Sequence, residues 1–162
     1  MPDQEHFVQF INNNEGILFK VSALYANSEP DAQDLRQEMV YQLWRSFDSF
    51  QGNSKRSTWM YRVALNTALV YVKKKKKQVT GDSEINEELL RQKDDTDAIE
   101  EEQIKKLYAT IKKLKEVDRG IIMLYLEGKS HDEIAEIIGF TTTNIGTRIG
   151  RIKKKLKTHI RN

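Results

Sequence analysis

Apolar residues recur along much of the chain at the three- and four-residue spacing of helices. Leu35, Met39 and Leu43, for example, lie four residues apart, which places them on one helical face that a core would bury. No segment shows the strict apolar and polar alternation of a half-buried strand. Pro2 and Pro30 both lie near the start of an expected helix, where a missing N–H costs little. We therefore predict an all-α protein.

The first half of the chain predicts a small bundle of four helices. Three of them cover about 5–11, 31–47 and 58–77, and the second of the four contains Ile17, Leu18, Val21 and Leu24. Residues 48–57 between the last two are rich in Gly, Ser and Asn, a composition typical of an exposed loop.

The last third of the chain predicts a helix-turn-helix. A helix with an apolar face over 104–114 and a second over about 118–126 precede Ser130-His-Asp-Glu133, a capping box in which serine and glutamate each satisfy a free backbone N–H. Gly139 ends the short helix that this box begins, and Thr141 caps a long final helix. The apolar stripe of that final helix consists of Ile145, Ile149, Ile152 and Leu156.

Charge is distributed unevenly and suggests how the helices divide into domains. The net charge is only +3, but residues 1–77 hold 11 Lys and Arg against 8 Asp and Glu, 78–104 hold 2 against 10, and 105–162 hold 14 against 6. An acidic, weakly apolar segment of this kind is typical of a linker. We predict two small helical domains, 1–77 and 104–162, joined by a flexible acidic linker at 78–103.

The composition argues against an enzyme, a metal site or a bound cofactor. The chain has no cysteine, and His6, His131 and His159 lie far apart without metal-ligand spacing. The absence of cysteine also favours the cytosol, and neither a signal peptide nor a run of about eighteen apolar residues is present. We expect a soluble, cytoplasmic protein that is not an enzyme.

The final helix carries the residue types that recognise duplex DNA. Opposite its apolar stripe it presents short polar and cationic side chains, which in a major groove contact base edges and phosphates. A solvated basic face on an ordinary helix is the alternative. The candidate residues are Thr142, Thr143, Thr147, Arg148 and Arg151.

The fourth helix and the loop before it combine an aromatic ring with cations and an amide. Such a set suits single-stranded DNA, because bases stack on rings while cations neutralise phosphates. For Trp59 alone, packing in the core is the alternative. The candidate residues are Lys55, Arg56, Ser57, Trp59, Arg62 and Asn66.

Two parts of the sequence resemble one known family, in the expected order. Residues 31–44, Phe50-Gln-Gly52 and 58–66 resemble domain 2 of the extracytoplasmic-function (ECF) sigma factors, which belong to the sigma-70-like superfamily. Residues 128–156 resemble their domain 4. A single helix-turn-helix would be weak grounds, but the pairing of both domains is specific.

The resemblance implies a function and its partners. The chain would bind core RNA polymerase, direct it to promoters and assist DNA opening, under control by an anti-sigma factor. The third helix would bind the polymerase, the loop and fourth helix would hold a flipped base of the minus-10 element, and the final helix would contact the minus-35 element. For polymerase binding the resemblance points to Asp34, Gln37, Glu38 and Tyr41.

The sequence departs from the family pattern where base preference is set. Arg56 and Ser57 stand where many members carry aromatic or basic residues before the Thr-Trp pair, and Gly146 and Gly150 replace larger residues on the final helix. Base preference at both promoter elements is therefore open. Two other functions also stay open: a helix-turn-helix regulator that binds duplex DNA without polymerase, and a helical adaptor that binds only protein.

Overall fold

A computed structural model describes residues 4–50, 55–78 and 98–161, and every regular element within these ranges is helical. The all-α prediction is confirmed. Contacts divide the chain into two compact units, Met1–Asp82 and Ser83–Asn162. The assignment of a linker to 78–103 stays a prediction, because 79–97 lie outside the described residues.

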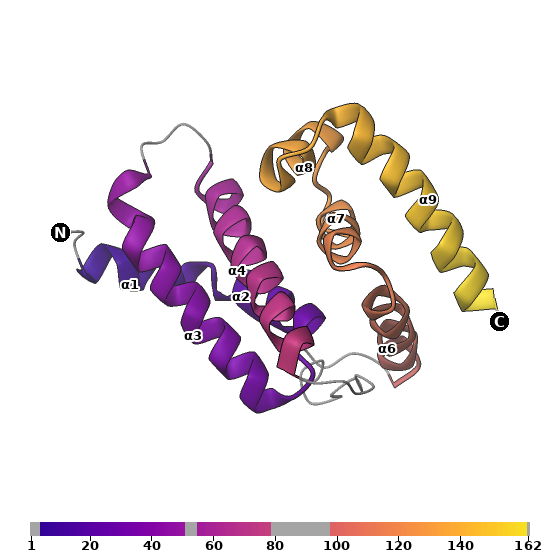
Figure 1. Ribbon diagram of the computed structural model, residues 1–162, viewed down its shortest axis with the longest axis horizontal. Coiled ribbons are helices and arrows are strands. Elements are labelled where there is room, and N and C mark those ends of the chain that lie inside the picture. Colours follow the sequence, from indigo (N-terminus) through magenta and orange to yellow (C-terminus); the bar gives the residue numbers. More distant parts are fainter. Residues whose placement is uncertain (1–3, 51–54, 79–97, 162) are drawn as a thin grey trace. The chain divides into compact units, whose positions relative to one another are not determined.

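The first unit contains α1 (Gln4–Asn13), α2 (Glu15–Tyr25), α3 (Glu29–Ser46), the 3-10 turn η1 (Phe47–Ser49) and α4 (Arg56–Gln78). Figure 1 shows α3 and α4 side by side, and α2 packs against both. Between them lie fully buried apolar side chains: Leu24, Leu35, Met39, Leu43, Met60 and Leu65.

Two helices of this unit begin two residues earlier than the sequence predicts. Ser28 caps α3, since its hydroxyl accepts a hydrogen bond from the backbone N–H of Asp31 at 3.2 Å, and Pro30 occupies the first turn. In α4 the N–H of Trp59 already donates to the carbonyl of Lys55 at 3.0 Å. The Ser28 cap therefore sets the start of α3, and the first backbone hydrogen bond marks the start of α4, both before the apolar pattern begins.

A second apolar centre of the first unit is aromatic and includes α1. The Phe7 ring lies 5.0 Å from the Trp44 ring and 5.2 Å from the Phe47 ring, measured between centroids. Phe10 stacks on Phe47 at 5.7 Å. These separations are those of favourable edge and offset ring pairs, so α1 is held by its aromatic face.

The second unit contains α6 (Ala98–Lys112), α7 (Glu116–Leu126), α8 (His131–Ile138) and α9 (Thr142–Arg161), the long terminal helix in Figure 1. The stripe predicted for α9 is buried, with Ile145, Ile149, Ile152 and Leu156 at most 8% exposed. The sequence predicts that this helix starts at residue 104, but α6 begins earlier, at Ala98. Glu101 and Glu102 follow its start, where negative charge is favourable.

The helix-turn-helix has the local contacts that the sequence predicts. The Ser130 hydroxyl accepts from the N–H of Glu133 at 3.1 Å, and the N–H of Ser130 donates to the Glu133 carboxylate at 3.3 Å. Gly139 ends α8 with φ of 89°, a conformation that strains residues with a Cβ. The Thr141 hydroxyl then accepts from the N–H of Asn144 at 3.1 Å and caps α9.

Candidate nucleic-acid interface

The solvent side of α9 is polar and cationic over three turns. Thr143, Thr147, Arg151 and Lys154 are all exposed and follow one another at four- and three-residue spacing, so they share one face. The Thr147 hydroxyl donates to the Thr143 carbonyl at 3.0 Å. Among the described residues Arg151 has no hydrogen-bond or ion-pair partner, so its guanidinium is available to a ligand.

One flank of α9 is fixed by the start of α8 and the end of α7. The Thr142 hydroxyl donates to Asp132 Oδ1 at 2.8 Å, and Lys153 Nζ lies 4.4 Å from the centre of the Tyr125 ring. A Cβ at Gly146 would lie 3.4 Å from Nδ1 of His131. This is an ordinary van der Waals distance to an exposed side chain, so packing against α8 does not explain why a poor helix former occupies this position.

The other flank of α9 is fixed by Arg148. Its Nη1 lies 3.1 Å from Oδ1 of Asp118, in the first turn of α7, and the two side chains are 32% and 11% exposed. Its Nε donates to Oδ1 of Asn144 at 2.8 Å. Of the five residues predicted to contact duplex DNA, Arg148 is thus bound to the protein, whereas Thr143, Thr147 and Arg151 are exposed.

The candidate single-strand residues gather at the first three turns of α4. Lys55, Arg56 and Asn66 are exposed, while Ser57 and Arg62 are half-buried. Trp59, Arg62 and Asn66 are spaced three and four residues apart and therefore share a face. The loop residues 51–54 lie outside the described ranges.

Trp59 is part of the aromatic centre. It is only 8% exposed, and its ring lies 5.1 Å from Phe50, 5.8 Å from Phe10 and 6.1 Å from Phe47. The Trp59 ring is therefore buried beneath the candidate face, where it packs against Phe10 of α1 and against Phe50 at the start of the loop.

The candidate polymerase-binding residues form a continuous exposed face of α3. Asp34, Gln37, Glu38 and Tyr41 follow the spacing of one helical face, and Tyr41 is 53% exposed. The amide of Gln42 donates to Glu38 Oε1 at 3.0 Å, and the Arg45 guanidinium lies 5.8 Å from the Tyr41 ring. The face is therefore acidic and aromatic, with cations at its end.

Sequence reasoning missed the contacts that join the end of α4 to α3. Lys75, within a run predicted to be a solvated helix end, places its Nζ 3.4 Å from Oδ1 of Asp31 and 5.7 Å from the Tyr71 ring. Burial of the Tyr71 hydroxyl, together with the charge of Asp31, raises the pKa of this tyrosine above its ordinary value. The four-residue spacing of Tyr71 and Lys75 could have predicted that these two side chains meet. Their acidic partner Asp31 could not be predicted in this way, because it lies 40 positions before Tyr71.

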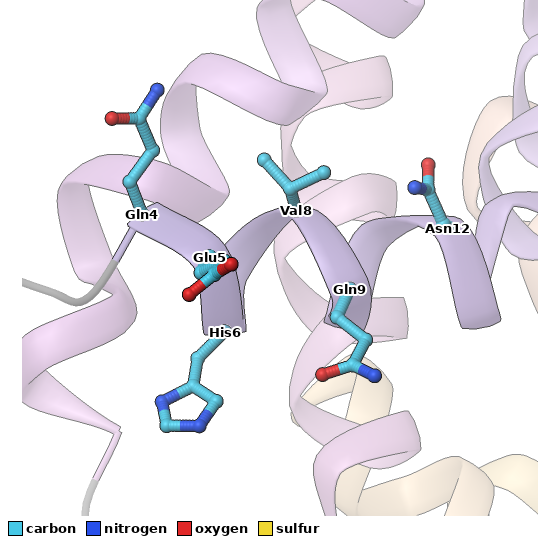
Figure 2. A pocket seen from close by; sticks show the side chains of 6 residues that line it. All are labelled: Gln4, Glu5, His6, Val8, Gln9 and Asn12. Carbon is cyan, nitrogen blue, oxygen red and sulfur yellow. The ribbon is translucent and has the colours of Figure 1, made fainter.

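A hollow on the outer side of α1 is lined by Gln4, Glu5, His6, Val8, Gln9 and Asn12, all from that single helix (Figure 2). Within the described ranges no three His, Cys, Asp or Glu side chains gather as a metal site would require. Among the helices searched there, none is long and apolar enough to cross a membrane.

Comparison with known families matches both units. Residues 10–78 match the family described as sigma-70 region 2, and residues 104–156 match sigma-70 region 4. The ECF RNA polymerase sigma-E factor of Escherichia coli is 30% identical across 87% of this chain and 81% of its own length. This chain belongs to the ECF sigma factors. The family matches and the relatives confirm the resemblance noted from residues 31–44, 50–52, 58–66 and 128–156.

Other relatives and solved structures agree with this family. The ECF sigma factor SigW of Bacillus subtilis is 27% identical across 98% of this chain and 91% of its own length. The fold is shared with the sigma factor RpoE of Bartonella quintana, solved with the anti-sigma factor NepR, at a TM-score of 0.77, 20% identity and coverage of 97% and 98%. It is also shared with CnrH, solved with the cytosolic domain of CnrY, at a TM-score of 0.69, 21% identity and coverage of 98% and 89%.

Proposed function

We propose that this sigma factor binds core RNA polymerase in the cytoplasm, directs it to promoters and assists DNA opening, without catalysing a reaction itself. The observation that carries the proposal is the exposed face of α3, because Asp34, Glu38 and Tyr41 are available at the surface of a well-packed helix. Tyrosine is enriched at the centre of protein interfaces, while charged groups lie at the polar rim around it.

The two DNA surfaces then divide the promoter between them. The α4 surface contacts the opened minus-10 element. It consists of Lys55, Arg56, Ser57, Arg62 and Asn66, with the buried ring of Trp59 beneath them. The α9 surface contacts the minus-35 duplex. The exposure of Asn66 and Arg151 supports these roles, since neither side chain is buried in the core.

Reversing charge on α3 tests polymerase binding. Asp34→Lys combined with Glu38→Lys should weaken core affinity by about tenfold or more, equivalent to about 1.4 kcal/mol. Affinity would be measured by fluorescence anisotropy of labelled sigma factor titrated with core polymerase. Glu5→Lys combined with Glu15→Lys makes the same change of charge at exposed positions on α1 and α2, outside this face, and serves as the matched control. Equal affinity of the two double variants would refute the assignment.

Asn66 tests the minus-10 surface. Asn66→Ala should slow opening of duplex promoters while leaving core affinity unchanged, because it removes a base-edge contact and little buried area. Opening would be followed by 2-aminopurine fluorescence in the minus-10 element, on duplex and on pre-melted DNA. Asn12→Ala, at an exposed position on α1, is the matched control. Equal losses of core affinity and of opening would show that Asn66 is structural.

A regulator that binds duplex DNA by itself is the competing function. Gel-shift assays with the free chain and with the reconstituted holoenzyme distinguish the two. The sigma factor should bind promoter DNA weakly alone and selectively with polymerase. Tight, sequence-selective binding by the chain alone would favour the competing function.

An anti-sigma protein is the remaining expected partner. The support is that a protein of the same fold was solved with an anti-sigma factor. Chain purified from its own host in a polymerase-free fraction should carry an equimolar second protein, which dissociates when core polymerase is added. A chain that is always alone or always with polymerase would argue against such control.

A further inference from the structure

Arg148 lies at the edge of the α9 surface, yet its guanidinium is already occupied. Asp118 lies 3.1 Å from one nitrogen, Asn144 2.8 Å from another, and the Phe140 ring centre is 4.9 Å from the central carbon. These partners come from the first turn of α7, from α9 itself and from the turn before α9. Nη1 and Nε are thus held by the protein, and the Phe140 ring covers one face of the guanidinium, so turning this side chain toward DNA would break these contacts.

The position of Arg148 on the helix explains this geometry. It lies three residues after buried Ile145 and immediately before buried Ile149, so it borders the apolar stripe. Thr147 and Arg151 lie on the opposite, solvent side. The Arg148 side chain therefore leaves α9 toward α7.

Asp118 makes the contact expensive to break. Asp118 is only 8% exposed, and a carboxylate that is buried to this extent needs a cationic partner. If Arg148 moved to a phosphate or a base, this carboxylate would be left buried and unpaired. Stranding a buried carboxylate in this way costs about as much as one base contact returns.

Contacts on the opposite flank complete the arrangement. Thr142 is bound to Asp132 at 2.8 Å on the α8 side, while Arg148 is bound to Asp118 on the α7 side. Two polar contacts on opposite flanks oppose rotation of α9 about its own axis. At a helix surface radius of about 5 Å, a rotation of about 20° moves a side chain by about 2 Å, enough to lose a hydrogen bond.

We infer that Arg148 is a positioning residue, which with Asp118 fixes the rotation of α9, and that Thr143, Thr147 and Arg151 contact the minus-35 bases and phosphates. This inference rests on the proposed sigma function. It changes the roles of two of the five residues that the sequence suggested for DNA contact, Arg148 and Thr142.

The experiment uses reconstituted holoenzyme and duplex DNA randomised across the minus-35 element, with the bound DNA sequenced to rank base preference. Arg148→Met should lower affinity about tenfold for all selected sequences while leaving the ranking unchanged. It should also leave the salt dependence of binding unchanged, because Asp118 already neutralises this cation. Arg151→Met is the matched control, which should lower the slope of log affinity against log salt by about one or alter the ranking.

A double variant separates positioning from direct contact. Adding Asp118→Asn to Arg148→Met removes the unpaired carboxylate. The double variant should therefore bind DNA several-fold better than Arg148→Met alone. Circular dichroism and core affinity, measured on every variant, keep the comparison among fully folded, polymerase-bound proteins.

Three outcomes would overturn the inference. They are a changed base ranking in Arg148→Met, a reduced salt slope in that variant, or a double variant no better than the single one. Failure of the sigma function itself looks different, because the unmodified holoenzyme would then select no minus-35 sequence at all.

Discussion

Helices α4 and α9 each present a candidate DNA surface, but their units hold them with different kinds of contact. Beneath α4, Trp59 packs among Phe10, Phe47 and Phe50, so apolar burial supports the surface. On α9 an ion pair and a hydroxyl–carboxylate hydrogen bond hold the flanks. Burial does not depend on charge, whereas a half-buried ion pair does, although salt screens it much less than a pair at the surface. Substitutions that leave a cavity should therefore disturb the position of α4, whereas substitutions that change charge should disturb the position of α9.

Removing the indole of Trp59 should have the largest effect. Trp59→Ala leaves a cavity in the aromatic centre and should destabilise the first unit by about 3–5 kcal/mol. Both tryptophans of the chain, Trp44 and Trp59, lie in this unit, so Trp44 fluorescence in urea follows its unfolding alone. Val70→Ala, at an exposed position, is the control. A loss below about 1 kcal/mol would mean that the cluster adds little to stability.

Removing the cap of α8 should have a smaller effect, confined to the second unit. Ser130→Ala leaves the N–H of Glu133 without its partner and should cost about 1 kcal/mol. The melting temperature of that unit, followed by far-ultraviolet circular dichroism, should fall by roughly 4–8 °C. Thr158→Ala near the end of α9 should change it little. An unchanged melting temperature in Ser130→Ala would show that water replaces the cap without loss.

The second unit should also depend on pH through Lys112. Burial, with a smaller contribution from the charge of Arg119, lowers the pKa of this lysine to about 8. In the unfolded chain Lys112 keeps its proton up to about pH 10.5. The free energy of unfolding should therefore rise with pH between about 8 and 10.5. Below pH 8 both states are protonated and the folded state bears the full penalty.

Lys112→Met keeps the aliphatic stem and removes the charge. It should raise the free energy of unfolding at pH 7, and this advantage should shrink as the pH rises from 8 toward 10. Urea unfolding at half-unit pH steps would measure it. A difference that is constant between pH 7 and 9.5 would mean that Lys112 titrates normally.

The smallest effect is expected where charges meet at the surface of the first unit. Lys75→Met breaks the pair with Asp31, whose side chain is 31% exposed, and should cost about 0.5 kcal/mol or less. Lys73→Met, at an exposed position in the same run, is the control. In 1 M salt the two variants should become equally stable. A larger loss that persists in salt would show that Lys75 stabilises the unit by packing against Tyr71.

The helices, the helix-turn-helix and the caps could be predicted because their determinants are local. Apolar spacing identified the buried stripe of α9, and Ser130, Gly139 and Thr141 marked the turn, since each acts on backbone groups within a few positions. The exposed face of α3 follows from the same periodicity, as the complement of buried Leu35 and Met39. The composition of both DNA surfaces could also be listed from the sequence.

Tertiary structure alone decided which of those side chains are free to bind. Trp59 is covered by rings from α1 and from the segment after α3, and Arg148 is held by an aspartate 30 positions earlier. Helical periodicity states which face a residue occupies, but not which neighbour lies opposite, because that depends on how separate helices pack. The sequence determined the helices and their faces, and packing between helices separated the positioning residues from those left exposed.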